Sequence, residues 1–192
     1  MQRYKWHSPA NVGSKEFTCG YCTRLVAATM GYFAEPQAGR GQPLIRICPN
    51  CELPTFFNQD TQVPGVAPGN AVGHLPADIQ ALYKEARQCV AASAPTSAVL
   101  TCRKLLMNIA VEQQAEEGKS FLHYVDYLAT KGYVPPNGRA WVDHIRQKGN
   151  EANHEIKLMS ADDALELILF IEMLLKFIYE FPAKVPTVPK TP

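Results

Sequence analysis

The sequence lacks a hydrophobic run long enough to cross a membrane. Its longest apolar stretch, residues 164–179, is interrupted by Glu166, Glu172 and Lys176, whereas a spanning helix needs about 20 consecutive and predominantly apolar residues. The opening residues MQRYKW lead into polar sequence, without the apolar segment of a secretion signal. These absences predict a cytoplasmic protein that has no membrane partner.

A strong excess of one charge is also missing. The chain carries 19 Lys and Arg against 18 Asp and Glu, which gives a net charge of +1 over 192 residues. A protein that binds long duplexes mainly through counterion release would be far more basic. Residues 1–60 hold a slight excess of two positive charges, and the only compositionally biased tract is the Pro-rich tail 182–192, which predicts disorder.

What the sequence does contain is two C-x-x-C pairs, CGYC at 19–22 and CPNC at 48–51. Two such turns can direct four thiolates at one tetrahedral Zn²⁺. Disulfides and an iron–sulfur centre are the alternatives, and the even spacing in a reducing compartment favours zinc. Four thiolates leave no position for a water molecule, so the predicted zinc is structural. Its predicted ligands are Cys19, Cys22, Cys48 and Cys51.

The residues around these pairs predict a small β-rich zinc ribbon over residues 1–60, with short strands near 16–18 and 44–47. Its aromatic side chains could stack on nucleic-acid bases or pack the core, and packing is the favoured interpretation. These side chains are Tyr4, Trp6, Tyr21, Tyr32, Phe33, Phe56 and Phe57.

The remainder predicts helices. Residues 61–74 are rich in Pro and Gly and indicate a linker, whereas 75–181 show helical periodicity with helices near 76–92, 96–116, 120–132, from 137 and from 160. The last helix is apolar on more than one side, which indicates a central helix or one covered by a second subunit. The predicted fold class is therefore mostly α, a helical bundle preceded by a small zinc ribbon.

A polar row lies before the last helix. Arg146, Asn150 and His154 follow at intervals of four residues, so a helix would place them on one face. A guanidinium, an amide and an imidazole in one row could bind phosphate. A merely solvated helix face is the alternative.

The run I-R-x-x-G-N-x-x-x-H at 145–154, followed by SADDA at 160–164, resembles an uncharacterised helical domain family found beside restriction and anti-phage systems. That family is similar to the HEPN superfamily, many of whose members are metal-independent ribonucleases. The resemblance covers residues 75–181, and a zinc module is a frequent companion. It implies a HEPN-like bundle, a homodimer and a partner protein in a defence system. Gly149 stands where the nuclease motif has an arginine.

Three functions follow as hypotheses. The preferred one is a protein of a bacterial defence or restriction-type system that binds RNA or a partner complex. The alternative is a metal-independent ribonuclease with Arg146, Asn150 and His154 as catalytic residues. The third is a regulatory partner of another enzyme. Nucleic acid would contact Arg103, Arg146 and Lys148, and the resemblance supports Arg103 in particular.

Overall fold

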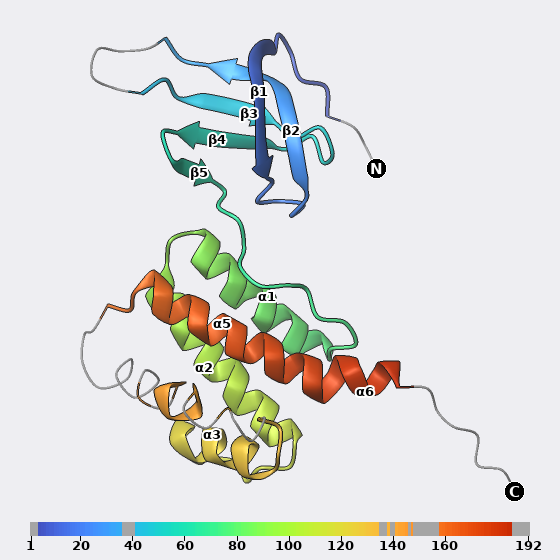
Figure 1. The fold of residues 1–192 in the computed structure, drawn as a ribbon, viewed down its shortest axis with the longest axis vertical. Helices are drawn as coiled ribbons and strands as arrows, with labels where there is room; N and C mark the ends of the chain where they lie inside the picture. The colour runs from blue at the N-terminus through green and yellow to red at the C-terminus, as the bar shows by residue number, and fades with distance from the viewer. Residues whose placement is uncertain are drawn as a thin grey trace, which may run out of the picture. The chain divides into compact units, whose positions relative to one another are not determined.

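The structure is a computed structural model that describes residues 4–35, 41–134, 138, 141–145, 147 and 158–185. The chain divides into two compact units, unit 1 (Met1–Ala67) and unit 2 (Pro68–Pro192). Unit 1 is a β-sheet and unit 2 is helical (Figure 1).

The prediction of a mostly α fold with a helical bundle is wrong. The chain is 46% helical and 19% strand, a mixed α/β fold in which a five-stranded antiparallel sheet precedes the helices. The prediction missed the length of the first two strands, which have nine residues each. Exposed side chains dominate both strands, so the alternation of apolar and polar residues that marks a half-buried strand is weak in them.

The sheet of unit 1 is a simple antiparallel meander with the strand order β1-β2-β3-β4-β5. Each strand pairs with the next one along the chain because short connections favour antiparallel neighbours. Strand β5 lies inside the segment that the sequence predicted as a linker. The strands are β1 (Ala10–Thr18), β2 (Leu25–Phe33), β3 (Leu44–Ile47), β4 (Pro54–Asn58) and β5 (Thr61–Val63).

Hydrogen bonds from the Arg46 side chain stabilise the irregular part of this sheet. The pairing of β1 with β2 shifts register between Asn11 and Lys15, which leaves backbone carbonyls without ladder partners. The buried guanidinium of Arg46 fills this gap, donating from Nη1 to the carbonyls of Gly13 (2.6 Å) and Ala28 (2.8 Å). Burial lowers the pKa of Arg46. This arginine is therefore a structural residue of unit 1.

The helices of unit 2 begin at recognisable signals. Pro95 stands in the first turn of α2, the Ser120 side chain caps α3, and Ser160 with Asp163 forms a capping box on α5. Residues 141–145 are also helical. The elements are α1 (Ala77–Ala91), α2 (Pro95–Glu112), α3 (Phe121–Thr130), α5 (Ala161–Leu175), the π-helix η2 (Lys176–Glu180) and α6 (Phe181–Lys184).

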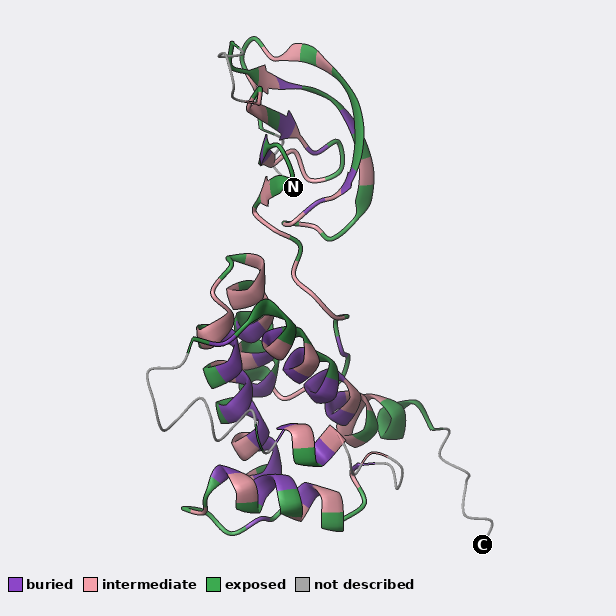
Figure 2. Cartoon of the chain, turned by 60° about the vertical axis from the view of Figure 1, so that its left-hand side comes forward, coloured by how far each residue is buried: buried purple, intermediate pink, exposed green. Residues whose placement is uncertain are grey.

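The core of unit 2 lies where α2 meets α1, α3 and α5. Figure 2 shows the buried residues on the facing sides of these helices. The largest side chain that is fully buried belongs to Phe170, whose ring meets Trp141 edge to face at 5.1 Å. No helix in the described part of the chain has the length and apolar character needed to cross a membrane.

The segment before α1 is bound to the helices of unit 2. Buried Glu172 accepts hydrogen bonds from the backbone N (2.8 Å) and the side-chain amide (2.9 Å) of Asn70. Arg87 donates to the carbonyls of Pro68 (2.6 Å) and Gly69 (2.8 Å). The second half of the predicted linker 61–74 is thus a docked part of unit 2.

Candidate functional site

The two C-x-x-C pairs lie in turns of the same backbone design. In the first, the N–H of Cys19 donates to the carbonyl of Arg24 (2.9 Å) and the N–H of Thr23 donates back to Cys19 (2.8 Å). In the second, Cys48 bonds to Leu53 (3.1 Å) in the same way, and the fourth residue after it again closes the turn at 2.8 Å. Equivalent turns present their thiols in equivalent ways.

The fourth residue after the first cysteine has positive φ in both turns. Thr23 has φ 58° and Glu52 has φ 60°, values that non-glycine residues adopt only rarely. Glu52 has further contacts, because its carbonyl accepts the indole N–H of Trp6 (2.9 Å) and its carboxylate accepts the N–H of Tyr4 (3.0 Å). The segment before β1 therefore braces the second turn.

The four thiols converge on one point. Sulfurs from opposite turns lie 3.7 Å apart for Cys19 and Cys51 and 3.8 Å apart for Cys22 and Cys48. All four sulfurs lie within 4.8 Å of one another. A tetrahedron with Zn–S bonds of about 2.3 Å has edges of about 3.8 Å, whereas a disulfide brings two sulfurs to about 2.05 Å. The cluster therefore fits a tetrahedral metal ion.

The thiols also need a cation to ionise together. Burial raises the pKa of Cys19, and burial together with the neighbouring thiols raises the pKa of Cys51 to about 12. Burial also acts against the thiolate of Cys22, but hydrogen bonds from the Arg24 backbone and the Asn50 side chain outweigh it and lower its pKa to about 7. A bound dication would stabilise all four thiolates, since metal ligation deprotonates the thiol.

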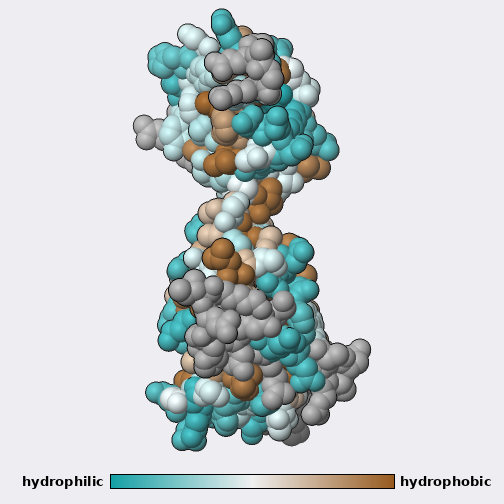
Figure 3. Space-filling view, turned by 90° about the vertical axis from the view of Figure 1, so that its left-hand side faces the viewer, coloured by the Kyte–Doolittle hydropathy of each residue, from teal (hydrophilic) through white to brown (hydrophobic). Residues whose placement is uncertain are grey.

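A second feature of unit 1 is a row of apolar side chains that crosses four strands. Direct register pairs join Tyr32 to Ile45, Ile45 to Phe56 and Phe56 to Val63, so the four side chains share one face of the sheet. Ile45 is 36%, Phe56 38% and Val63 54% exposed. Apolar groups are visible between hydrophilic ones on unit 1 in Figure 3. We call these four residues the outer-face row.

The structure separates the aromatic residues that the sequence grouped together. Phe57 is buried and meets Phe17 edge to face at 4.9 Å, so it packs the core as predicted. Phe33 points to the opposite face from the outer-face row, because it pairs with Leu44. The rings of Tyr4, Tyr21, Phe33 and Phe56 are exposed.

The predicted phosphate row cannot be assembled from the described residues, because Arg146, Lys148, Asn150 and His154 lie outside them. Arg103 is described. Its guanidinium lies 4.3 Å from the ring centroid of Phe121 and is only 7% exposed.

Burial lowers the pKa of Arg103, and its buried Nη1 has no hydrogen-bond partner in the described part of the chain. The Nη1 group of such an arginine can donate a hydrogen bond to an anionic group or to a carbonyl oxygen.

One polar contact in this region was not predicted. The Nε2 atom of His144 lies 2.5 Å from a carboxylate oxygen of Glu166, and both side chains are partly exposed. The two residues are 22 positions apart in the chain, and no spacing rule connects them. The pairing depends on the fold of unit 2, so sequence reasoning had no signal for it.

Residues 84–191 match the family described as a domain of unknown function, DUF4145, which is more than half of the chain. The chain belongs to this family. The DUF4145 match begins inside α1, and the cysteine cluster lies outside it. The prediction of an uncharacterised domain family behind a four-cysteine module is confirmed to that extent, and the likeness to the HEPN superfamily stays a prediction. No curated protein and no solved structure matches the chain.

Proposed function

We propose that the chain is a zinc-stabilised protein that binds single-stranded RNA through the sheet of unit 1. The observation that carries the proposal is the outer-face row, in which Tyr32 and Phe56 stand on β2 and β4 of an antiparallel sheet with Ile45 between them. Aromatic side chains on a sheet face are a common platform for unstacked bases. The small positive excess of residues 1–60 suits an RNA backbone better than an acidic surface would.

Zinc has a structural role in this proposal. The donor set of four thiolates at tetrahedral separations is the set that structural zinc prefers. Because the turns that carry the cysteines flank β2, β3 and β4, the metal would hold the strands of the outer-face row in register. Loss of the metal should therefore also remove RNA binding.

Fluorescence anisotropy with a labelled single-stranded RNA, at one stated salt concentration, tests the proposal. Phe56→Ala should weaken binding by about 1–3 kcal/mol, the value of one base stacked on a ring. Phe33→Ala is the matched control, since it removes an exposed phenylalanine from the opposite face. The proposal fails if the intact protein does not bind RNA or if the two variants weaken binding equally. The row would then be assigned to a protein partner.

We also propose that a second copy of the chain covers an apolar stripe on the last helix of unit 2. The stripe repeats every four residues, and Leu169 (52%), Phe177 (48%) and Phe181 (45%) are widely exposed. An α-helix of 3.6 residues per turn makes such a stripe drift by about 40° per step. The wider π turn of η2, at Lys176–Glu180, offsets part of this drift between Phe177 and Phe181. The stripe consists of Leu165, Leu169, Met173, Phe177, Phe181 and Val185.

The charged side chains beside the stripe are paired within the chain, Lys176 with Glu172, Lys184 with Glu180 and Glu166 with His144. The proposed self-association therefore rests on the exposed apolar side chains of the stripe. Phe177→Glu should convert a dimer into a monomer in light scattering at micromolar concentration. Leu100→Glu, on α2 and similarly exposed at 44%, is the control. A monomer of the unmodified protein would contradict the proposal.

Leu174 is unsuitable for that test because it is fully buried, so Leu174→Glu would unfold the core.

Ribonuclease activity stays a prediction of the sequence, as does a place in a defence system. Incubation of the protein with RNA in EDTA tests the first, since cleavage without metal that is lost in His154→Ala would assign the activity to the row of Arg146, Asn150 and His154.

A further inference from the structure

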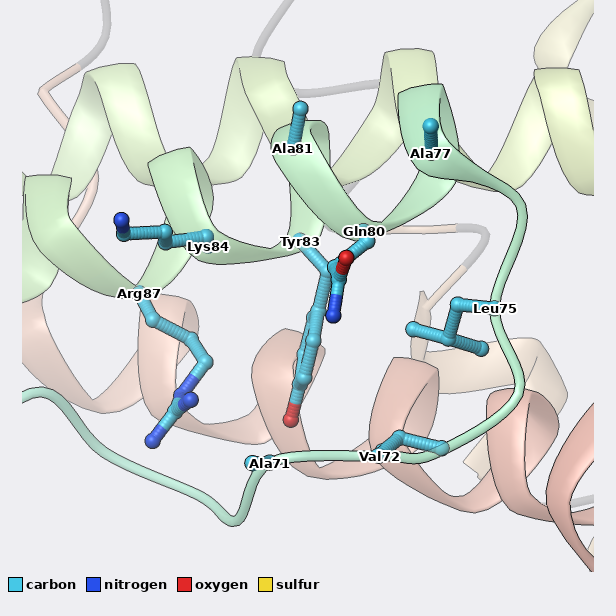
Figure 4. A pocket seen from close by; sticks show the side chains of 9 residues that line it. All are labelled: Ala71, Val72, Leu75, Ala77, Gln80, Ala81, Tyr83, Lys84 and Arg87. Carbon is cyan, nitrogen blue, oxygen red and sulfur yellow. The ribbon is translucent and has the colours of Figure 1, made fainter.

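A cavity of about 390 Å³ lies in unit 2 between α1 and the segment that precedes it. Figure 4 shows Gln80, Tyr83 and Arg87 reaching from α1 toward the stretch that carries Ala71 and Val72. Its volume falls in the range of about 300–1,000 Å³ that is typical of sites for small molecules. The residues that line the cavity include none from the cysteine cluster, the outer-face row or the apolar stripe.

The wall opposite α1 is held in place. The phenol of Tyr83 donates to the carbonyl of Asn70 (3.0 Å), and Asn70 is bound in turn to Glu172. The N–H of Gly73 donates to the carboxylate of Glu180 at 2.8 Å. A pocket whose walls are fastened before binding loses little free energy on ordering when a ligand enters.

The lining gives this cavity an apolar body with a positive end. Small alanines, including Ala77 and Ala81, leave the space open, and the Tyr83 ring forms one side. Lys84 and Arg87 supply two cations one turn apart on α1, and none of the described residues that line the cavity is acidic. The carboxylate of Glu172, which lies close to Tyr83, is already bound by Asn70 and Lys176.

The Lys84 and Arg87 side chains can still pair with an anionic group of a ligand. Arg87 uses Nε and Nη2 for the carbonyls of Pro68 and Gly69 and lies over the Tyr83 ring, and among the residues that the structure describes it has no carboxylate partner. Lys84 is exposed and has no ion-pair partner in the part of the chain that the structure describes. Figure 4 shows the Lys84 and Arg87 side chains at the same end of the cavity but pointing in different directions, so a carboxylate that enters at this end can pair with either cation.

We propose that this cavity binds a small organic acid with a compact apolar or aromatic body, its carboxylate toward Lys84 and Arg87. The apolar part would lie against Val72, Tyr83 and the alanines, where removal of its surface from water favours binding. This site is independent of the proposed RNA-binding face.

The test uses phenylacetate as the probe and phenylacetamide as its neutral counterpart, with binding followed by NMR on the full-length protein. Phenylacetate should bind about tenfold more tightly than the amide, because only the acid gains charge-assisted bonds. Lys84→Gln should remove most of that difference and leave amide binding unchanged. Ala81→Leu, at an exposed helix position where leucine is readily accommodated, should fill the cavity and abolish binding of both.

The proposal is overturned if phenylacetate does not bind at millimolar concentration, or if acid and amide bind equally. It is also overturned if Ala81→Leu leaves the affinity for phenylacetate unchanged, since the ligand would then lie elsewhere. Arg103→Ala serves as a control, because it removes a cation outside the cavity and should not change phenylacetate binding in a folded protein.

Discussion

The two units of the chain are stabilised by different means. In the described residues of unit 1, the buried apolar cluster has five members, of which two are Cys19 and Cys48 from the metal cluster. Unit 2 buries a continuous core that includes fully buried leucines and isoleucines from α2 and α5. A small domain with so little apolar burial needs another source of free energy. We therefore expect unit 1 to depend on a metal ion bound by the four cysteines and unit 2 to depend on hydrophobic burial.

Removal of one predicted metal ligand should affect the two units most differently. Cys48→Ser should release the metal and unfold unit 1, because structural zinc supplies about 10–16 kcal/mol of apparent binding free energy in zinc-finger peptides. Unit 2 should remain folded. Limited proteolysis combined with circular dichroism separates the two results, and Cys89→Ala, a cysteine outside the cluster, is the control. Loss of both units together would contradict independent stabilisation.

A substitution in the hydrophobic core of unit 2 tests the other half of this difference. Phe170→Ala should lower the free energy of unfolding of this unit by about 3–5 kcal/mol, because it leaves a cavity beside Trp141. The metal content of the protein should not change. Thermal unfolding followed by tryptophan fluorescence, with metal analysis of the same sample, measures both quantities. Metal loss in this variant would show that the units are coupled.

A smaller effect is expected where unit 1 packs its backbone closely. A Cβ on Gly20 would lie 2.4 Å from the carbonyl oxygen of Pro64 and 2.5 Å from that of Gly65. Gly20→Ala should therefore destabilise unit 1 by about 1–3 kcal/mol, since backbone must move. Gly13→Ala is the comparison, because it meets no atom within 4 Å and bears only the strain of φ +72°. Equal melting temperatures for the two variants would contradict the close contact.

A pH dependence is expected in the stability of unit 2. Burial raises the pKa of Glu172, but hydrogen bonds from Lys176 and Asn70 outweigh this, and the net pKa lies below its ordinary value of 4.5. A carboxyl whose pKa is lower in the folded state stabilises the fold above its unfolded pKa, and this contribution is lost as pH falls through the folded pKa.

The melting temperature of unit 2 should accordingly fall as the pH is lowered below about 4.5. Glu172→Gln should flatten this dependence and lower the stability at neutral pH by about 1–3 kcal/mol through weakened bonds to Asn70 and Lys176. Glu117→Gln, at an exposed position, should leave the pH profile unchanged. The same pH profile in Glu172→Gln and the unmodified protein would remove Glu172 from this role.

Local features of the chain could be predicted because their causes are local. The spacing of the cysteines indicated a four-thiol cluster, and Ser120 and Ser160 marked the starts of α3 and α5. The mixed fold class was missed because β1 and β2 bury few residues and show little alternation. The pocket was missed because its wall depends on Asn70 and Glu172, which are 102 positions apart.

The central claim is that one metal ion, bound by Cys19, Cys22, Cys48 and Cys51, holds unit 1 together. X-ray absorption at the zinc edge, with elemental analysis of the same preparation, tests it most directly. We expect one zinc per chain with four sulfur neighbours at about 2.3 Å. Fewer than four sulfur neighbours, disulfides among these cysteines, or a folded unit 1 without metal would contradict it.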